Sequence, residues 1–140
     1  MSDTLTPLER GRRMAAVRAK DTQPEMLVRR HLHRLGYRYR LHRRDLPGTP
    51  DLVFPSRRAV VFVHGCFWHW HEGCALARMP KSRLEFWQDK LEGNRQRDLR
   101  QLGELTALGW RVLVVWECEL KNQEALVARL RGFLEGGETT

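Results

Sequence analysis

Residues 64 to 74 read HGCFWHWHEGC and bring metal ligands, titratable groups and large rings into one short segment. The segment holds three histidines, two cysteines and three aromatic residues, but only one acidic side chain. Thiolates and imidazoles are ligands that zinc prefers, and an imidazole also exchanges protons near neutral pH. The segment therefore predicts a metal site, acid–base chemistry, or both.

Four side chains indicate a zinc site. Cys66, His71 and Cys74 lie within nine residues, and Cys118 comes just after a predicted buried strand. If that strand ends beside the loop, Cys118 joins the other three in a tetrahedral Cys3His set. The alternative is that Cys118 packs in the core and that the other two cysteines are incidental loop thiols. We favour structural zinc, because the cysteines all flank strand ends and the loop has little else to hold its shape.

A closed four-ligand site leaves His64 and His69 over. A histidine by itself is usually a surface residue or a satisfied core residue. Two spare histidines beside Asp51, on a neighbouring predicted strand, instead favour acid–base catalysis.

The helices that must position these residues are marked by three S/T-x-x-E capping boxes. The boxes begin at Thr6, Thr22 and Ser82. They predict a basic helix to about Lys20, a helix that Gly36 ends, and a long helix over residues 83–108. The residues expected to face the core are Leu27, Val28, Leu32 and Leu35 on the second helix and Trp87, Leu91, Leu99, Leu102 and Leu105 on the third.

Apolar runs predict the strands. Residues 37–41 alternate between apolar and basic side chains, as in a half-exposed strand. Runs at 51–54, 59–63 and 110–116 follow, and the last two are apolar enough for strands buried on both faces. With a final helix capped by Asn122, the order is α-α-β-β-β-α-β-α. It includes a strand–helix–strand crossover and predicts an α/β fold, a mixed central sheet flanked by helices.

The formal net charge of +8 favours a polyanionic partner, chiefly nucleic acid. The basic excess is concentrated in the first 44 residues. No apolar run approaches the ~20 residues that a membrane span needs, and the N-terminus lacks the apolar core of a signal peptide. We therefore expect a cytoplasmic protein without a membrane partner, which also suits an odd number of cysteines.

Four segments together carry a family likeness: GTPDLVF, VVFVHGCFWH, EFWQDKLEGNRQRD and LGWRVLVVWECEL. In this order, over roughly residues 10–120, they resemble the very short patch repair (Vsr) endonucleases of bacteria. The resemblance implies a restriction-endonuclease-like fold and nicking of double-stranded DNA 5′ of the thymine in a T:G mismatch left by deamination of 5-methylcytosine. It further implies a functional link to a cytosine-5 methyltransferase, a monomer, and association with the nucleoid when bound to DNA. We then expect a single endonuclease domain: a DNA-contacting helix over 1–20, a core over 21–135 and a disordered tail over 136–140.

The same resemblance assigns the metal-dependent chemistry. Pro50 and Asp51 supply the first carboxylate of an altered PD…(D/E)xK site, and Phe62-Val63-His64 stand where an acid-x-lysine is usual. Histidines must then cover part of the work. Magnesium, which prefers oxygen ligands, is expected on Asp51 and the Val63 backbone carbonyl.

The histidines receive roles by analogy with the family. His69 is the base that activates water and is held by Glu25, whereas His64 pairs with Asp98 and stabilises or protonates the leaving group. Both carboxylates have plainer interpretations. Glu25 is the acid of a capping box, and Asp98 can be an exposed helix residue paired with neighbouring arginines. The chain is also one residue longer before its second cysteine than the family members to which we compare it, so His69 and His71 can exchange roles.

The aromatic residues complete the resemblance. Phe67 and Trp68 on the loop, with Trp87 on the long helix, match rings that the family inserts beside the mismatch, because a T:G pair is easier to unstack. The alternative for Trp87 is core packing. Met14 resembles a residue that enters from the opposite groove, and Lys90 and Asn94 match positions for base or phosphate contact. Trp70 receives no role.

Two rival functions stay open. One is a sequence-specific nuclease with the same fold that cuts matched DNA. The rings expected to insert beside the mismatch argue against it, because cutting matched DNA does not require intercalation. The other is a zinc module that only binds DNA, which has no need of the Pro50-Asp51 turn beside a strand ending in His64.

Overall fold

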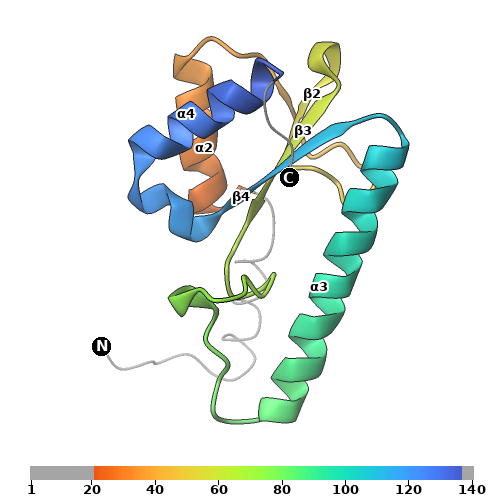
Figure 1. Cartoon of the computed structure of the whole chain (residues 1–140), viewed down its shortest axis with the longest axis vertical. Helices are drawn as coiled ribbons and strands as arrows, with labels where there is room; N and C mark the ends of the chain where they lie inside the picture. Colours follow the sequence, from red (N-terminus) through yellow and green to blue (C-terminus); the bar gives the residue numbers. More distant parts are fainter. Residues whose placement is uncertain (1–20, 137–140) are drawn as a thin grey trace.

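The computed structural model describes residues 21–136 (Figure 1). The helices and strands are α2 (Gln23–Arg34), β1 (Arg40–Leu41), β2 (Leu52–Phe54), β3 (Ala59–His64), α3 (Leu84–Ala107), β4 (Arg111–Trp116) and α4 (Gln123–Leu134). Within the described residues, this order confirms the predicted succession of helices and strands. The predicted helix over 1–20, with Met14, lies outside the described residues, as does the predicted tail apart from Gly136.

The four strands form one sheet in the order β1-β2-β3-β4. β1 pairs with β2 and β2 with β3 in antiparallel fashion, whereas β3 and β4 run parallel from Ala59↔Arg111 to His64↔Trp116. The parallel pair is connected by α3, as a crossover requires. The sheet is therefore mixed, as predicted.

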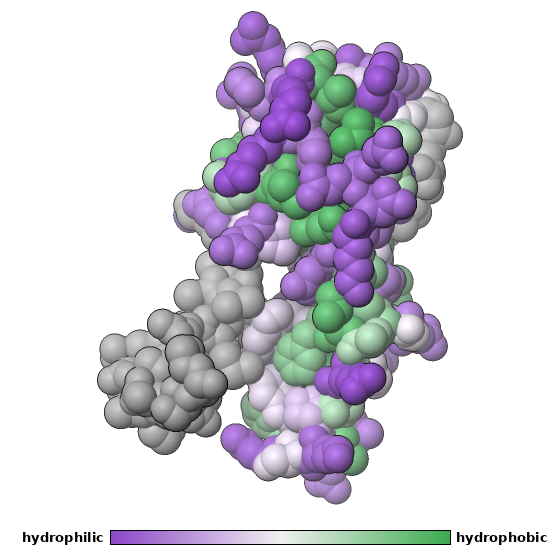
Figure 2. All heavy atoms as spheres, turned by 90° about the vertical axis from the view of Figure 1, so that its left-hand side faces the viewer, coloured by the Kyte–Doolittle hydropathy of each residue, from purple (hydrophilic) through white to green (hydrophobic). Residues whose placement is uncertain are grey.

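Helices cover both faces of the sheet, with α2 and α4 on one side and α3 on the other (Figure 1). Strand residues alternate between the two layers, so Ala59 and Val61 pack toward α2 and α4, whereas Val60 and Phe62 pack toward α3. Hydrophilic side chains cover most of the outer face of α2 and α4, with small apolar areas between them (Figure 2). The structure confirms the α/β fold and is consistent with a restriction-endonuclease-like arrangement.

The ends of α2 follow local signals in part. Thr22 Oγ1 accepts a hydrogen bond from Glu25 N, but the Glu25 carboxylate accepts from Asp21 N, so the capping box is only half formed. Gly36 has φ +87°, which confirms it as the left-handed stop. Leu35, expected in the core, is 36% exposed.

The long helix α3 departs from prediction at its start and on its face. The Ser82 capping box is wrong, because α3 begins at Leu84 after Arg83 in a left-handed conformation, without a side-chain cap. Leu99 is 56% exposed, so its predicted burial is wrong too. The buried residues are Leu91, Asn94 and Leu105. Their spacing continues through position 98 rather than 99, since a helix repeats every 3.6 residues. No helix among residues 21–136 is both long and apolar enough to cross a membrane.

Three arginines at one end of the sheet close helix C-termini. Arg58 donates to Leu108 O at 2.9 Å, Arg111 to Phe133 O at 2.6 Å, and Arg57 to Leu134 O at 2.9 Å. Each of these carbonyls lies at the end of its helix, where the last carbonyls lack a partner in a following turn, although Phe133 O also accepts from Gly136 N. A cation at such an end is also favoured by the helix dipole. Part of the basic excess therefore stabilises the fold.

Candidate active site and metal centre

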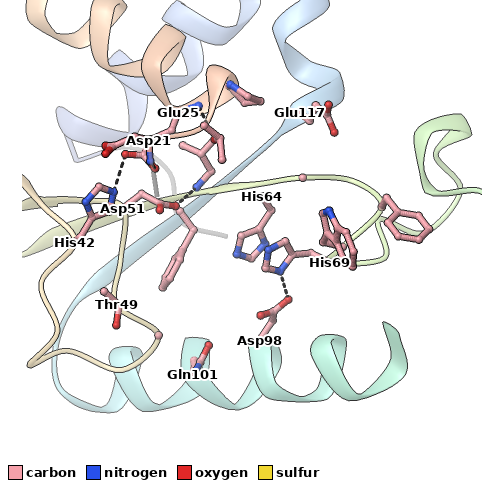
Figure 3. Close-up of a pocket in the computed structure, with 18 of the residues that line it drawn as sticks. Asp21, Glu25, His42, Thr49, Asp51, His64, His69, Asp98, Gln101 and Glu117 are labelled. Carbon is pink, nitrogen blue, oxygen red and sulfur yellow. Dashed lines mark hydrogen bonds and ion pairs between the residues drawn. The ribbon is translucent and has the colours of Figure 1, made fainter. Parts of the chain in front are cut away.

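A cleft of about 1140 Å³ opens where β2 begins and β3 ends, between the start of α2 and the middle of α3 (Figure 3). Its lining includes the carboxylates Asp51, Glu25 and Asp98 and the imidazoles His64 and His69. Phe67 and Trp68 stand in its wall. All five of the predicted catalytic residues thus share one cleft, although they come from four separate segments.

Asp51 comes just before β2 and is held by the main chain of the neighbouring strand β3. The last pair between β2 and β3 is Leu52↔Val61, and beyond it Val63 N donates to Asp51 Oδ2 at 2.7 Å. Burial raises the pKa of Asp51 to about 7, and the nearby Glu25 carboxylate adds to the rise. A buried carboxylate beside the main chain of Val63, in a cleft that also contains Glu25, fits a hard cation such as magnesium.

The raised pKa of Asp51 predicts a pH dependence of stability. The folded protein binds this proton more tightly than the unfolded chain, whose aspartates titrate near pH 3.8, so folding takes up protons between about pH 4 and 7. The contribution of Asp51 to stability is therefore lost as the pH rises through this window. In magnesium-free denaturant titrations between about pH 5.5 and 8, we expect Asp51→Asn to lack that decline. Equal slopes for the variant and the parent protein would contradict the assignment.

His64 and His69 stack face to face beneath β3, on the side of α3 (Figure 3). Their ring centroids are 3.7 Å apart and their planes differ by 5°. His69 Nδ1 lies 2.6 Å from Asp98 Oδ2. Since a carboxylate accepts only, Nδ1 carries the proton, and Nε2 is left with the lone pair. Burial lowers the pKa of His64 well below its ordinary value, so it is a neutral imidazole at neutral pH.

The predicted carboxylate partners of the two histidines are therefore wrong. Asp98 pairs with His69 and not with His64, whereas Glu25 bonds to Arg29 and to His42, the latter at 2.7 Å. The reason lies in the layers of the fold. His64 has the same strand parity as Phe62 and points toward α3, whereas Glu25 begins α2 on the opposite side of β3 (Figure 3).

The four predicted zinc ligands converge. One donor atom each from Cys66, His71, Cys74 and Cys118 lies within 4.8 Å of the others. His71 Nδ1 is 3.6 Å from Cys66 Sγ and 3.5 Å from Cys118 Sγ. A tetrahedral ion with Zn–S of about 2.3 Å and Zn–N of about 2.05 Å separates two such ligands by about 3.5 Å. The donor set and its spacing therefore fit zinc, with His71 rather than His69 as the fourth ligand.

The three cysteines of this cluster have shifted pKa values. Burial raises the pKa of Cys66 to about 12, and burial also raises the pKa of Cys118. The Leu76 N–H lowers the pKa of Cys74. Thiolates are the form that binds metal, so metal binding at this cluster releases protons.

Three aromatic rings form a cluster at the mouth of the cleft. Phe67 lies 5.0 Å from Trp68 and 5.4 Å from Trp87, and the two tryptophans are 5.9 Å apart between centroids. Trp87 is half-buried against the loop rings, not in the sheet core. Asn94 is 8% exposed, and its Nδ2 donates to Trp68 O at 2.9 Å. Asn94 thus fastens the loop to α3, and its predicted DNA contact stays a prediction, as does that of the half-buried Lys90.

Comparison with known proteins decides the family. The sequence profile described as DNA mismatch endonuclease Vsr matches residues 2–76. The type II nicking enzyme V.XorIIP of Xanthomonas oryzae is 59% identical over 135 residues, which covers 96% of this chain and 98% of that protein. The DNA mismatch endonuclease Vsr of Escherichia coli is 42% identical over 141 residues, 97% and 90% of the two chains. The chain belongs to the Vsr family of DNA mismatch endonucleases.

Two residues in this Vsr-family site were missed by sequence reasoning. Arg29 bonds to both Asp21 and Glu25, and its i,i+4 spacing from Glu25 on α2 is a signal that predicts such a pair. His42 reaches Glu25 from the loop after β1 with φ +49°, and no local pattern predicts that contact. Arg29 forms an ion pair with this carboxylate, which is only 2% exposed, and His42 forms a hydrogen bond with it.

The ring cluster of this Vsr-family chain is also larger than predicted. Phe86, 45% exposed, lies 5.1 Å from Trp87 and extends the cluster along α3. Trp70 adopts φ +45° and lies half-buried at the side of the loop away from these rings.

Proposed function

We propose that this protein nicks one strand of duplex DNA 5′ of the thymine in a T:G mismatch and so begins the repair of deaminated 5-methylcytosine. The observation that carries the proposal is the shared cleft. Asp51 and the His69–Asp98 pair line it, and the three-ring cluster of Phe67, Trp68 and Trp87 stands at its mouth. A phosphodiester beside a distorted base pair would meet both features at once.

Hydrolysis of a phosphodiester requires an activated water, neutralised phosphate charge and a protonated leaving oxygen. His69 accepts the proton of the attacking water at Nε2, because Asp98 holds the proton on Nδ1. The water oxygen bonds to phosphorus as the P–O3′ bond breaks, and the leaving O3′ takes up a proton from solvent. Asp51 and the Val63 carbonyl would hold magnesium, which supplies charge neutralisation at the phosphate when bound.

His64 acts beside this pair as a neutral imidazole. Its ring stacks on His69 and is 6% exposed. A neutral ring offers one N–H, which can donate a hydrogen bond to an oxygen of the phosphate or of the leaving group without adding charge. Stacking also fixes the plane in which His69 approaches its water.

The three-ring cluster recognises the mismatch because a T:G pair unstacks more easily than a matched pair. Inserting a ring between base pairs costs a few kcal/mol and costs least at a weak pair. The loop must therefore be rigid before it meets DNA. The zinc cluster, with the Asn94 bond to Trp68 O, supports that rigidity.

A comparison of two duplexes tests the proposed function. The duplexes are end-labelled and identical except for a T:G or a C:G pair at one position, and magnesium is present in both. We expect nicks only in the T:G duplex and only in the strand that carries the thymine. A panel of flanking bases would then define the sequence context and hence the specificity of the methyltransferase with which the enzyme would work.

A second candidate is nicking of matched DNA at a specific sequence. It is favoured by the relative that is named a type II nicking enzyme and is 59% identical. Equal nicking of the T:G and C:G duplexes would support this candidate over mismatch repair. For either function we propose a monomer, because one cleft suffices to cut one strand.

The His69–Asp98 pair predicts graded losses of activity. Removing the base in His69→Ala is expected to lower single-turnover nicking by about 10²-fold or more. Asp98→Asn keeps the shape but no longer enforces the tautomer, so we expect a smaller loss, about 10-fold. The control is Glu104→Gln, an exposed carboxylate on the same helix. A larger loss for Asp98→Asn than for His69→Ala would contradict His69 as the base.

A further inference from the structure

Trp116 connects the two chemical centres of the molecule. It ends β4 directly opposite His64, the last residue of β3, in the parallel register. Its ring stacks on His71 with centroids 4.1 Å apart and planes within 6°. The same ring meets His64 edge-on at 5.2 Å and 76°. With the His64–His69 stack, four rings run without interruption from a zinc ligand to the catalytic base.

His64 depends on these ring contacts for its orientation. Its Nδ1 is buried and has no hydrogen-bond partner among residues 21–136. The side chain is held by His69 on one face, by Trp116, and by Phe62 at 5.5 Å. A histidine without a polar partner turns freely unless its neighbours fill the space around it. The Trp116 indole therefore restricts the orientation of the His64 ring.

His71 is fixed from two sides. Its Nδ1 faces the sulfur atoms of Cys66 and Cys118, and its ring plane lies on the indole of Trp116. Ligand orientation at a metal site depends on such outer contacts as well as on the metal. Movement of the indole would therefore change the orientation of both His71 and His64.

We propose that Trp116 is a positioning residue that couples the zinc site to the catalytic histidines. The indole is held in place by its stack on His71 and in turn restricts the orientation of the His64 ring. The His64 ring then restricts the orientation of the His69 ring through their stack. This inference rests on the proposed function for the roles of His64 and His69. It concerns the rate of the chemical step and not DNA binding, because the ring contacts of Trp116 within the described chain do not include Phe67, Trp68 or Trp87.

Kinetics provide the first test. For Trp116→Leu we expect kcat for the T:G duplex to fall about 10²-fold, as small misplacements of catalytic groups do, with KM changed less than about 2-fold. Trp116→Phe retains a ring and is expected to recover about half of that loss on a logarithmic scale. The matched control is Trp110→Leu, which removes a buried tryptophan of the α3-facing core whose ring contacts within residues 21–136 are with Arg43 and Arg58. It should lower stability but leave kcat close to that of the parent protein.

Histidine resonances provide a readout that does not depend on nicking. The indole ring current displaces the ring-proton shifts of His71 and His64 in the zinc-loaded parent protein. Loss of this ring current moves those shifts by itself, so the deciding signal is that of His69, whose ring neighbour within the described chain is His64. In Trp116→Leu and Trp116→Phe the His69 shifts should move as well, with bound zinc still near one per chain, whereas Trp110→Leu should leave them in place.

The outcomes separate the two proposals. Unchanged kcat in both Trp116 variants, or losses equal to that of Trp110→Leu at matched stability, would overturn the coupling. A rise in KM as the main effect would overturn it too, because it would assign Trp116 to DNA binding. If the parent protein nicks no T:G duplex, the proposed function fails by itself. The His69 resonances then still decide whether Trp116 orients the histidines: displaced His69 shifts support this and unmoved His69 shifts overturn it.

Discussion

Asp51→Asn is expected to reduce magnesium-dependent nicking of a T:G duplex by at least about 10³-fold while duplex binding stays within a few-fold of that of the parent protein. Asparagine preserves the size of the side chain and can still accept from Val63 N through its amide oxygen. What it removes is the negative charge that draws a cation into the cleft. Single-turnover nicking of end-labelled DNA measures the first quantity, and fluorescence anisotropy of labelled duplex measures the second.

A matched control is available six residues earlier. Asp45 is exposed and pairs with Arg43 on the surface, so Asp45→Asn should change neither rate nor binding appreciably. A parallel loss of binding in Asp51→Asn would mean that the carboxylate organises the DNA surface and not the reaction. Full activity in Asp51→Asn would remove the metal-dependent mechanism altogether.

Loss of one zinc ligand is the second change with a large expected effect, on stability and activity together. Cys118→Ser should retain much less than one zinc per chain and lose about 3 kcal/mol or more of unfolding free energy, because zinc binding at a structural site contributes directly to folding. Of the four proposed ligands Cys118 alone lies outside the loop, so its loss removes the metal link between the loop and the end of β4 and leaves the His71–Trp116 stack and the Cys66 N–Glu117 hydrogen bond there. Elemental analysis and denaturant unfolding measure the two quantities.

The control for this change is a titratable residue outside the cluster. His33 is exposed on α2, and His33→Ser should retain the metal and the stability of the parent protein. If Cys118→Ser held a full equivalent of zinc at unchanged stability, the Cys3His assignment would be wrong. If the purified parent protein lost no stability on complete removal of zinc, the rigid loop would need another explanation.

The order of helices and strands along the chain was predicted from local sequence patterns, because each pattern reflects a strong local conformational preference. Asn122 accepts from Ala125 N at the start of α4, and Gly36 turns left-handed after α2, as their positions predict. The apolar runs of β3 and β4 identify the central parallel pair, because a strand buried on both faces must be apolar throughout. The Cys3His cluster was predicted too, because thiolates and an imidazole gathered in this way are typical of a metal site.

Errors occurred where a polar residue takes a place that periodicity would give to an apolar one. Leu99 was expected inward because it is apolar, but the buried stripe of α3 passes through Asn94 and Asp98, which serve the loop and His69. Ser82 was expected to cap α3, but the approach of the chain places Arg83 at that position. Functional sites commonly break local rules in this way.

The amino-acid sequence by itself determined the family, the order of helices and strands, the members of the Cys3His cluster and the catalytic candidates that line the cleft. Only the tertiary structure decided that Asp98 pairs with His69, that Arg29 and His42 bond to Glu25, and that Trp116 contacts both His71 and His64. The physical reason is that these contacts join segments far apart in the chain. The face of β3 toward which a side chain points, set by strand parity and register, determines which helix it meets.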